Sequence, residues 1–269
     1  MGFALGICRR AGRVEWFCDA GNGLKDGVIM MNGTLLVVLA HPDDESFPMG
    51  GTLAKYAMRG ARVELVCATR GEAGIPGKSP VEAAQIRERE LRAAANVLGL
   101  AGVRFLGYQD GQLATANPDY VLTQLVTLMW ETRPDVVITF GPDGISGHPD
   151  HIAIHHFTTQ AFDRAKLTGA RLFYIAPSEA TRQGCGVTPS SKIAGGPVAA
   201  IDVNEYLVTK VRAMQCHASQ NPPFSGPPEE EAQRLACHEY FTLARPVASQ
   251  KGLTDLFAFG AAVSLPQGG

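Results

Sequence analysis

The sequence lacks the features that mark nucleic-acid-binding, membrane-spanning or disulfide-stabilised proteins. Its 269 residues carry 24 Lys and Arg against 26 Asp and Glu, a formal net charge of −2, so we expect no basic surface for nucleic acid or an anionic membrane. No apolar run is long enough for a membrane span. The six cysteines show no C-x-x-C spacing, which is typical of buried thiols in a reducing compartment. We therefore expect a cytoplasmic protein that acts on a small molecule.

Buried-strand and helix patterns alternate along the chain, as in a parallel sheet covered by helices. With 45% hydrophobic residues, the chain can bury a sizeable core. The predicted strands are 34–40, 62–68, 103–106, 135–140, 171–176 and 198–203. The predicted helices are 48–59, 80–98, 118–132, 150–167, 204–218 and 228–244. The pattern favours an α/β, Rossmann-like three-layer fold with a mainly parallel central sheet and helices on both faces.

Three segments differ from the body of the chain. Residues 1–31 are glycine-rich and lack periodicity, so we expect an irregular N-terminal extension, with Met30 and Met31 as alternative starts. Residues 32–250 are predicted to form the domain and residues 251–269 a C-terminal tail. Residues 177–197 indicate one long loop, which is typical of binding loops and of mobile connections alike.

The first predicted strand leads directly into the most polar turn of the chain, His41-Pro-Asp-Asp-Glu45. Ligands of open α/β sheets bind outside the carboxyl ends of the strands. One imidazole and three carboxylates within five residues would repel one another unless a cation or hydrogen-bond donors offset their charge. A divalent metal is the simplest such cation, and histidine with aspartate suits zinc.

A second polar motif, Gly147-His-Pro-Asp-His151, follows the buried strand pattern at 135–140. Pro149 fits the first position of a helix, with His148 as the residue that caps it. His151 then lies in the first turn, facing the loop before the helix. The two motifs would meet if the two strands were neighbours in one sheet, and together they would supply the ligands of a metal site.

The chain resembles the LmbE-like (PIG-L) family of zinc-dependent deacetylases in two motifs, Ala40-His-Pro-Asp-Asp-Glu45 and Gly147-His-Pro-Asp-His151. This family is related to N-acetylglucosaminylphosphatidylinositol de-N-acetylase. The resemblance extends over about residues 34–245 and includes Thr69–Gly74, Gly107–Gly111 and the segment from Lys210 to Gln220. It implies a hydrolase that removes an acetyl group from an N-acetylated small molecule, in the first place an N-acetylglucosamine conjugate, through attack of metal-activated water on the amide.

Matched position by position, the resemblance makes His41, Asp44 and His151 the ligands of one zinc ion per chain. The residue types agree, since a catalytic zinc keeps three protein ligands and leaves its fourth position to water. Imidazole and carboxylate ligands suit iron(II) as well, so Fe²⁺ stays open as the alternative metal.

The resemblance also makes Asp43 the general base and places His148 beside the oxyanion that forms on the amide. Asp43 and Asp44 can divide the work, one accepting the water's proton and the other binding the metal. We expect His148 to be protonated and to stabilise the oxyanion. Asp150 is placed to orient an imidazole ligand, a role that metal-binding histidines usually require.

Five further positions have open roles. Arg70 and Asp110 follow the second and third strands, where the resemblance implies contacts with sugar hydroxyls, so they are candidate substrate-binding residues. Some relatives have a tyrosine that polarises the carbonyl at the position of Ser146, which leaves more of that work to His148. Glu45 suits the first turn of a helix at least as well as catalysis. His217 could approach the site or hold the last helix.

Two alternatives to a sugar deacetylase use the same site: an amidase acting on a non-sugar amide, and a metal-binding homologue without catalysis. Asp43 and His148 argue against the second, since neither is needed merely to hold a metal. A nucleotide- or dinucleotide-binding module, suggested by Gly141, Gly144 and Gly147, fits poorly because the spacing is not G-x-G-x-x-G. The oligomeric state is not indicated by any pattern.

Overall fold

The computed structural model describes residues 6–10, 13–17, 32–176, 198–246 and 252–258. The strands of its main sheet are β3 (Thr34–Leu39), β4 (Arg62–Cys67), β5 (Gly102–Phe105), β6 (Val136–Thr139), β7 (Arg171–Ile175), β8 (Val198–Asp202) and β9 (His238–Arg245). The α-helices are α1 (Gly50–Met58), α2 (Pro80–Leu98), α3 (Pro118–Thr132), α4 (Pro149–Ala165), α6 (Leu207–Cys216) and α7 (Pro228–Glu231). All six predicted strands are present, each within one residue of its predicted ends.

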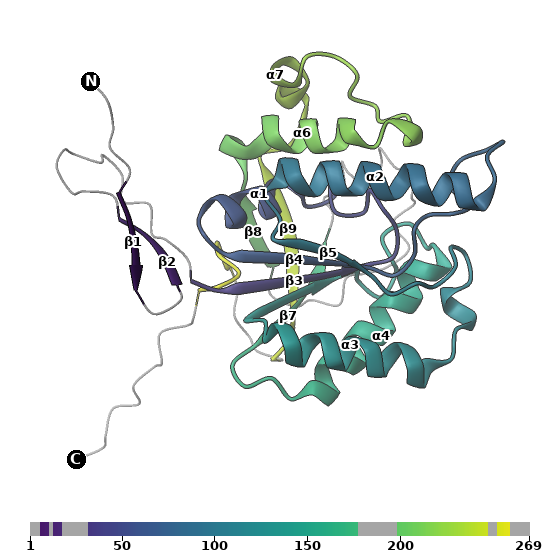
Figure 1. Ribbon diagram of the computed structural model, residues 1–269, viewed down its shortest axis with the longest axis horizontal. Coiled ribbons are helices and arrows are strands. Elements are labelled where there is room, and N and C mark those ends of the chain that lie inside the picture. Colours follow the sequence, from purple (N-terminus) through teal and green to yellow (C-terminus); the bar gives the residue numbers. More distant parts are fainter. Residues whose placement is uncertain (1–5, 11–12, 18–31, 177–197, 247–251, 259–269) are drawn as a thin grey trace.

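The helices form two layers around the sheet (Figure 1). Helices α1, α2 and α6 lie over one face, and α3 and α4 lie over the other. Strands β3, β4 and β6 are buried along nearly their whole length, as expected of parallel strands covered on both sides. This arrangement confirms the predicted α/β fold with a mainly parallel sheet.

Local signals in the sequence explain why α2 begins and ends where the pattern predicted. The Ser79 side chain accepts a hydrogen bond from the amide of Glu82, and the Glu82 side chain accepts one from the amide of Ser79, a capping box. Pro80 occupies the first helical position. Gly99 ends the helix with φ of 76°, a left-handed conformation that costs glycine little.

The sheet order, β5-β4-β3-β6-β7-β9-β8, reverses its direction of growth at β3. From β3 the chain builds outward through β4 and β5 on one side, and then returns to add β6 and β7 on the other. Strands β3 and β6 are therefore parallel neighbours, with Leu36 opposite Val137. Loops leaving such a pair diverge to opposite faces, and ligands of α/β sheets bind in the space between them.

The helix predicted at 228–244 is wrong over most of its length. Only Pro228–Glu231 is α-helical, and His238–Arg245 forms β9, which pairs antiparallel with both β7 and β8. The acidic, polar start of the segment favoured a helix, whereas Tyr240, Phe241 and Thr242 are good strand formers. The segment forms a strand because β7 and β8 provide hydrogen-bonding edges on both of its sides. Those edges are formed by residues outside the segment, and such tertiary contacts override local propensity.

The ends of the described chain carry further structure. Within the predicted irregular extension, β1 (Gly6–Arg10) and β2 (Arg13–Phe17) pair antiparallel. Within the predicted tail, Leu256 is fully buried and its amide donates to the Tyr56 hydroxyl. The predicted loop at 177–197 lies outside the described residues. None of the described helices has the length and apolar character of a membrane span.

Candidate metal centre

The two polar motifs meet at the carboxyl ends of β3 and β6. His41 Nδ1 lies 3.1 Å from His151 Nε2. Asp44 completes the triangle, with one carboxylate oxygen 3.7 Å from His41 Nδ1 and the other 3.3 Å from His151 Nε2. Ligand atoms bound at 2.0–2.2 Å to a tetrahedral zinc lie roughly 3.3–3.6 Å apart. The three predicted ligands therefore have the spacing of a metal site.

The hydrogen bonds around the two imidazoles assign the protons that they carry. His151 Nδ1 lies 2.9 Å from the carbonyl oxygen of Gly144, so it must be the N–H and Nε2 keeps its lone pair. His41 Nε2 faces carboxylate oxygens of Asp110 at 3.1 Å and Asp150 at 3.2 Å, so its proton lies there and Nδ1 is free. Once His41 Nδ1 has lost its proton, two nitrogen lone pairs and the Asp44 carboxylate point at one another, and the donor to that carboxylate among the described contacts is the amide of His41, at 2.8 Å from Oδ2. A cation fits this set.

Asp150 and Asp110 hold the first of these imidazoles from behind. Asp150 is fully buried and accepts hydrogen bonds from the amides of Gly111 at 2.7 Å and Leu113 at 3.1 Å, besides facing His41. Burial lowers the pKa of His41, but its hydrogen bonds to Asp110 and Asp150 and the charge of Asp44 outweigh this and raise that pKa to about 10. The same carboxylates would stabilise a metal cation bound at Nδ1.

The two predicted substrate-binding residues have different partners. Asp110 lies against His41, and although burial raises its pKa, the hydrogen bond to and charge of His41 lower it to about 2. Arg70 instead forms an ion pair with Glu88 at 2.8 Å and lies over the ring of Phe105. It lines a shallow groove with Glu72, Pro80, Val81, Ala84, Gln85, Glu88 and Gln109. The groove adjoins the centre, because Glu72 accepts a hydrogen bond from the amide of Asp110.

Asp43 lies in the same loop as His41 and Asp44 and has an unusual backbone conformation. Its φ is 96°, which costs a residue with a side chain of the order of 1–3 kcal/mol. Its carboxylate lies 3.2 Å from a guanidinium nitrogen of Arg87. Burial, followed by the charge of Asp44, raises the pKa of Asp43 to about 7 although Arg87 lowers it. A carboxylate with such a pKa suits proton transfer near neutral pH.

His148 caps α4 as predicted, and the cap determines its charge. Its Nδ1 accepts a hydrogen bond from the amide of Asp150 at 3.1 Å, so that nitrogen carries no proton. Burial and the neighbouring His41 and His151 lower the pKa of His148. The expected protonated imidazole is therefore replaced by a neutral one whose Nε2–H can donate. Among the described contacts, Ser146 Oγ makes one hydrogen bond, which it accepts from the amide of His148 at 3.4 Å.

His148 also lies close enough to be considered as a ligand. The nitrogen atoms of His41, His148 and His151 can be chosen within 4.8 Å of one another, and a second such group is His41, Asp110 and Asp150. Asp44 fits better as the third ligand, since its oxygens lie 3.7 Å and 3.3 Å from the two imidazole nitrogens and add a negative charge. The second group faces the protonated side of His41.

The sequence reasoning missed Arg87 and left Glu45 and His217 undecided. Arg87 is 4% exposed on α2 and reaches the loop after β3. Glu45 and His217 are both fully buried, with 2.7 Å between Glu45 Oε1 and His217 Nε2. Glu45 Oε2 in turn accepts a hydrogen bond from the amide of Asp43 at 3.0 Å. The signal for Arg87 was a charged residue on the inward face of an amphipathic helix.

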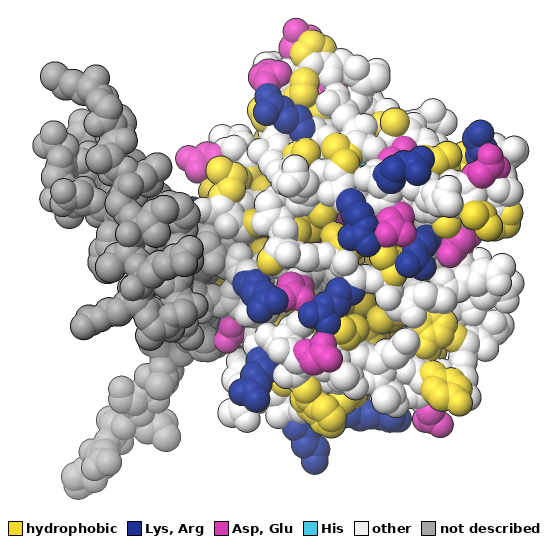
Figure 2. Space-filling model, viewed as in Figure 1, with side chains coloured by type: hydrophobic (Ala, Val, Ile, Leu, Met, Phe, Trp, Pro, Cys, Tyr) yellow, Lys and Arg dark blue, Asp and Glu magenta, His cyan; other side chains and the backbone are white. Residues whose placement is uncertain are grey.

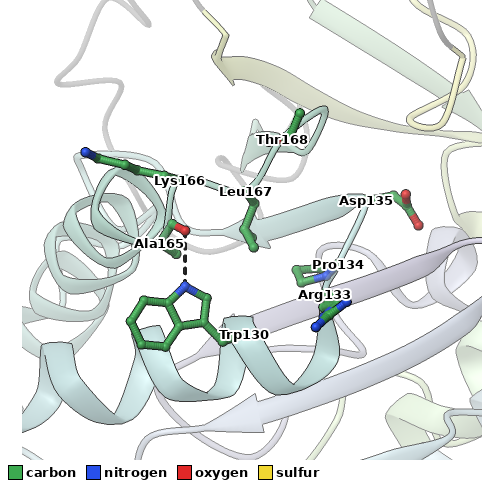
Figure 3. A pocket seen from close by; sticks show the side chains of 8 residues that line it. All are labelled: Trp130, Arg133, Pro134, Asp135, Ala165, Lys166, Leu167 and Thr168. Carbon is green, nitrogen blue, oxygen red and sulfur yellow. Dashed lines mark hydrogen bonds between the residues drawn. The ribbon is translucent and has the colours of Figure 1, made fainter.

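The opposite end of the sheet has a hollow with different chemistry (Figure 3). It is lined by Trp130, Arg133, Pro134, Asp135, Ala165, Lys166, Leu167 and Thr168, at the ends of α3 and α4 and the start of β6. The indole nitrogen of Trp130 donates to the carbonyl oxygen of Ala165 at 3.1 Å. No histidine lines this hollow among the described residues, so it is not the reactive centre.

On the face of the protein seen in Figure 2, basic and acidic side chains are interspersed.

Comparison with known proteins decides the family. Residues 36–162 match the model of the PIG-L family, described as GlcNAc-PI de-N-acetylase. A 1D-myo-inositol 2-acetamido-2-deoxy-alpha-D-glucopyranoside deacetylase from Acidothermus cellulolyticus is 35% identical over 275 residues, covering 84% of this chain and 94% of that protein. The chain belongs to the PIG-L family.

Two further comparisons show how wide the likeness is. A probable N-acetyl-alpha-D-glucosaminyl L-malate deacetylase 2 from Bacillus anthracis is 34% identical over 191 residues, covering 69% of this chain and 80% of that protein. The crystal structure of the 4-carboxy-2-hydroxymuconate hydratase from Pseudomonas putida superposes with a TM-score of 0.61 at 20% identity, covering 82% of this chain and 99% of that one. The second likeness shows the fold alone, so the activity of this PIG-L protein has to be argued from its site.

Proposed function

We propose that this PIG-L protein is a metal-dependent N-deacetylase that removes the acetyl group from an N-acetylglucosamine conjugate. One observation carries the proposal. Two imidazole nitrogens and the Asp44 carboxylate converge at metal-ligand spacing, with the ring of His148 next to both imidazoles and Asp43 adjacent to Asp44 in the same loop. We assign His41, Asp44 and His151 as the ligands of one ion, zinc in the first place.

The metal, when bound, would lower the pKa of the attacking water and polarise the acetamide carbonyl. Asp43 accepts the proton of that water, since its pKa near 7 leaves a basic carboxylate at neutral pH. The same proton can then pass to the leaving amine, whose basicity exceeds that of the carboxylate. Asp43 therefore serves both proton transfers, and no further acid is required by the described geometry.

His148 is assigned to the oxyanion. Its neutral ring presents Nε2–H, because Nδ1 is occupied by the cap hydrogen bond from the amide of Asp150. A neutral donor held by a helix terminus needs no reorganisation when charge develops on the carbonyl oxygen. Asp110 and Asp150 orient His41 from its Nε2 side. We therefore assign Asp110 to the support of a ligand rather than to the sugar.

The conjugate is inferred from two relatives and from the groove beside the centre. Both relatives are named for an N-acetylglucosaminyl group joined to a small polar molecule, inositol in one and malate in the other. The groove that Arg70 lines carries the carboxylates of Glu72 and Glu88 and the amides of Gln85 and Gln109. Such a lining suits hydroxyl groups, and we place the part of the substrate beyond the sugar there. A cytoplasmic location remains our proposal, supported by the free thiols of Cys67, Cys216 and Cys237.

The experiment that tests the proposal is release of acetate from N-acetylglucosamine conjugates by the purified, metal-analysed protein. The panel should contain the inositol conjugate, the malate conjugate, free N-acetylglucosamine and a simple non-sugar acetamide. We expect hydrolysis of at least one conjugate, loss of activity with a chelator, and recovery on adding zinc. Equal or faster hydrolysis of the non-sugar acetamide would favour the amidase alternative. Bound metal without hydrolysis of any amide would favour the non-catalytic one.

A further inference from the structure

Asp43 is held in its strained conformation from two directions. Its backbone N–H donates to Glu45 Oε2 at 3.0 Å, which fixes the peptide on one side. On the other side, one guanidinium nitrogen of Arg87 donates to the carbonyl oxygen of Pro42 and also lies 3.2 Å from Asp43 Oδ2. The contact with Glu45 lies within the ligand motif, whereas Arg87 is 44 residues further along the chain.

Arg87 occupies a slot shaped for its guanidinium. Its second nitrogen donates to the carbonyl oxygen of Gly71 at 3.3 Å. A Cβ placed on Gly71 or on Gly74 would overlap this guanidinium, so a side chain at either position would displace Arg87 from its place. The Nε of Arg87 is buried without a hydrogen-bond partner among the described atoms, and a buried polar group left in that state disfavours folding. A residue held at such a cost is typical of a functional site.

Glu45 is itself anchored deep in the protein. Its Oε1 faces His217 Nε2 at 2.7 Å, and both side chains are fully buried. His217 is the C-cap of α6, a helix that packs on α1 and α2. The position of the Asp43 peptide is thus tied to α6 through Glu45, while its carboxylate is tied to α2 through Arg87. These two helices lie side by side over one face of the sheet (Figure 1).

We propose that Arg87 is a positioning residue for Asp43: it acts through the Pro42 carbonyl and the Asp43 carboxylate to keep that carboxylate aimed at the reacting water, while Glu45 fixes the adjoining peptide. The inference rests on the proposed function for its kinetic part. Arg87 does not touch the substrate or the three ligand atoms in this scheme. Small errors in the placement of a catalytic group are expensive, with about 1 Å costing ~10²-fold in rate.

The decisive experiment is a double-mutant cycle between Arg87 and Asp43. Arg87→Met should lower kcat by ~10–100-fold with little change in KM and with the metal content unchanged. In the Asp43→Asn background, the same substitution should change kcat by less than ~2-fold, because the group it positions is already gone. An equal loss of kcat in both backgrounds, or loss of metal from Arg87→Met, would overturn the proposal. Arg89→Met, an exposed arginine on the same helix, is the control and should leave kcat unchanged.

A second variant tests the same idea without touching the arginine. Gly74→Ala should displace the guanidinium from its slot and reproduce the kcat loss of Arg87→Met, again only when Asp43 is present. Gly102→Ala is its matched control, since a Cβ there meets no atom within 4 Å. If Gly74→Ala is fully active and its crystal structure shows the Arg87 guanidinium in its original place, glycine at position 74 is not needed to hold Arg87, and that part of the proposal is overturned.

A structural readout separates failure of this inference from failure of the proposed function. In a crystal structure of Arg87→Met, we expect the Asp43 carboxylate to move from the position it has in the unmodified protein, which can be seen whether or not a substrate is known. An Asp43 carboxylate unmoved in that structure overturns the positioning role even if the protein is a deacetylase. A displaced carboxylate supports the positioning role, even where the acetate assay has ruled out deacetylation.

Discussion

Two buried clusters of charged groups among the described residues differ in whether their acceptors are matched by donors. In one, Glu239 accepts hydrogen bonds from the amides of Gly51 and Thr52 at the start of α1 and from Lys210 Nζ at 2.6 Å. Lys210 and Glu239 are 7% and 4% exposed. Every carboxylate oxygen has a donor there, so this cluster is complete without a ligand.

The cluster at the end of β3 and β6 is not complete. His41 Nδ1, His151 Nε2 and the carboxylate of Asp44 face one another. The one donor to Asp44 among the described contacts is the amide of His41, at 2.8 Å from Oδ2, so Asp44 Oδ1 has none. Buried acceptors without donors raise the free energy of the folded state unless something binds them. The comparison shows that burial of charged groups does not by itself distinguish a functional cluster from a structural one. The decisive feature is the balance of donors and acceptors.

Replacing one of the proposed metal-binding residues should have the largest effect on the cluster at the end of β3 and β6. His41→Ala should reduce metal content from about one ion per chain to a small fraction, since two ligands bind far more weakly than three. Deacetylase activity should fall with the metal to the limit of detection. Metal analysis of the purified variant beside an acetate-release assay measures both. Full metal occupancy in His41→Ala would show that the ligand set is wrong, and Asp44→Ala should behave as His41→Ala does.

Asp43→Asn should separate catalysis from metal binding. We expect ~10²–10⁴-fold lower kcat, as for loss of a general base, with metal content unchanged because Asp43 contributes no ligand atom. The measurement is kcat per metal-loaded chain. If Asp43→Asn loses metal while its remaining metal-loaded chains stay active, Asp43 is the ligand and Asp44 the general base.

His148→Gln should lower kcat by ~10²–10³-fold, the scale of losing one oxyanion donor. Metal content should be unchanged, since Asp44 rather than His148 is assigned as the third ligand. This variant also decides between the two ligand sets compatible with the geometry. Metal analysis that shows a loss parallel to the loss of kcat would place His148 on the metal.

Lys210→Met should have the smallest effect on activity and should instead lower stability. Removing the lysine leaves Glu239 buried with only its two amide donors, and breaking a buried ion pair costs ~3–5 kcal/mol of unfolding free energy. Denaturant unfolding measures this, and kcat per folded chain should stay within ~2-fold. If Lys210→Met kept its stability but lost catalysis, the self-satisfied cluster would be part of the active site.

The sequence predicted the parts of this fold that depend on near neighbours. Helices at 80–98 and 118–132 have the bounds found in the structure, because their caps and the prolines at their first positions are local signals. It failed at His238–Arg245, where an acidic start favoured a helix. That segment became a strand because β7 and β8 offered it hydrogen bonds on both edges, and neither edge can be read from the segment itself.

The candidate site divides in the same way. The residues of the two motifs, such as His41 and His151, could be named from the sequence because histidine and aspartate carry metal chemistry wherever they stand. The roles of Asp110 and Arg87 could not, since each depends on a contact across more than 40 residues. The charge of His148 was also undetermined until the cap hydrogen bond from Asp150 was seen. Residue type determines which chemistry a side chain can perform, whereas its pKa and its partners depend on what packs around it. Only the tertiary structure decides that packing.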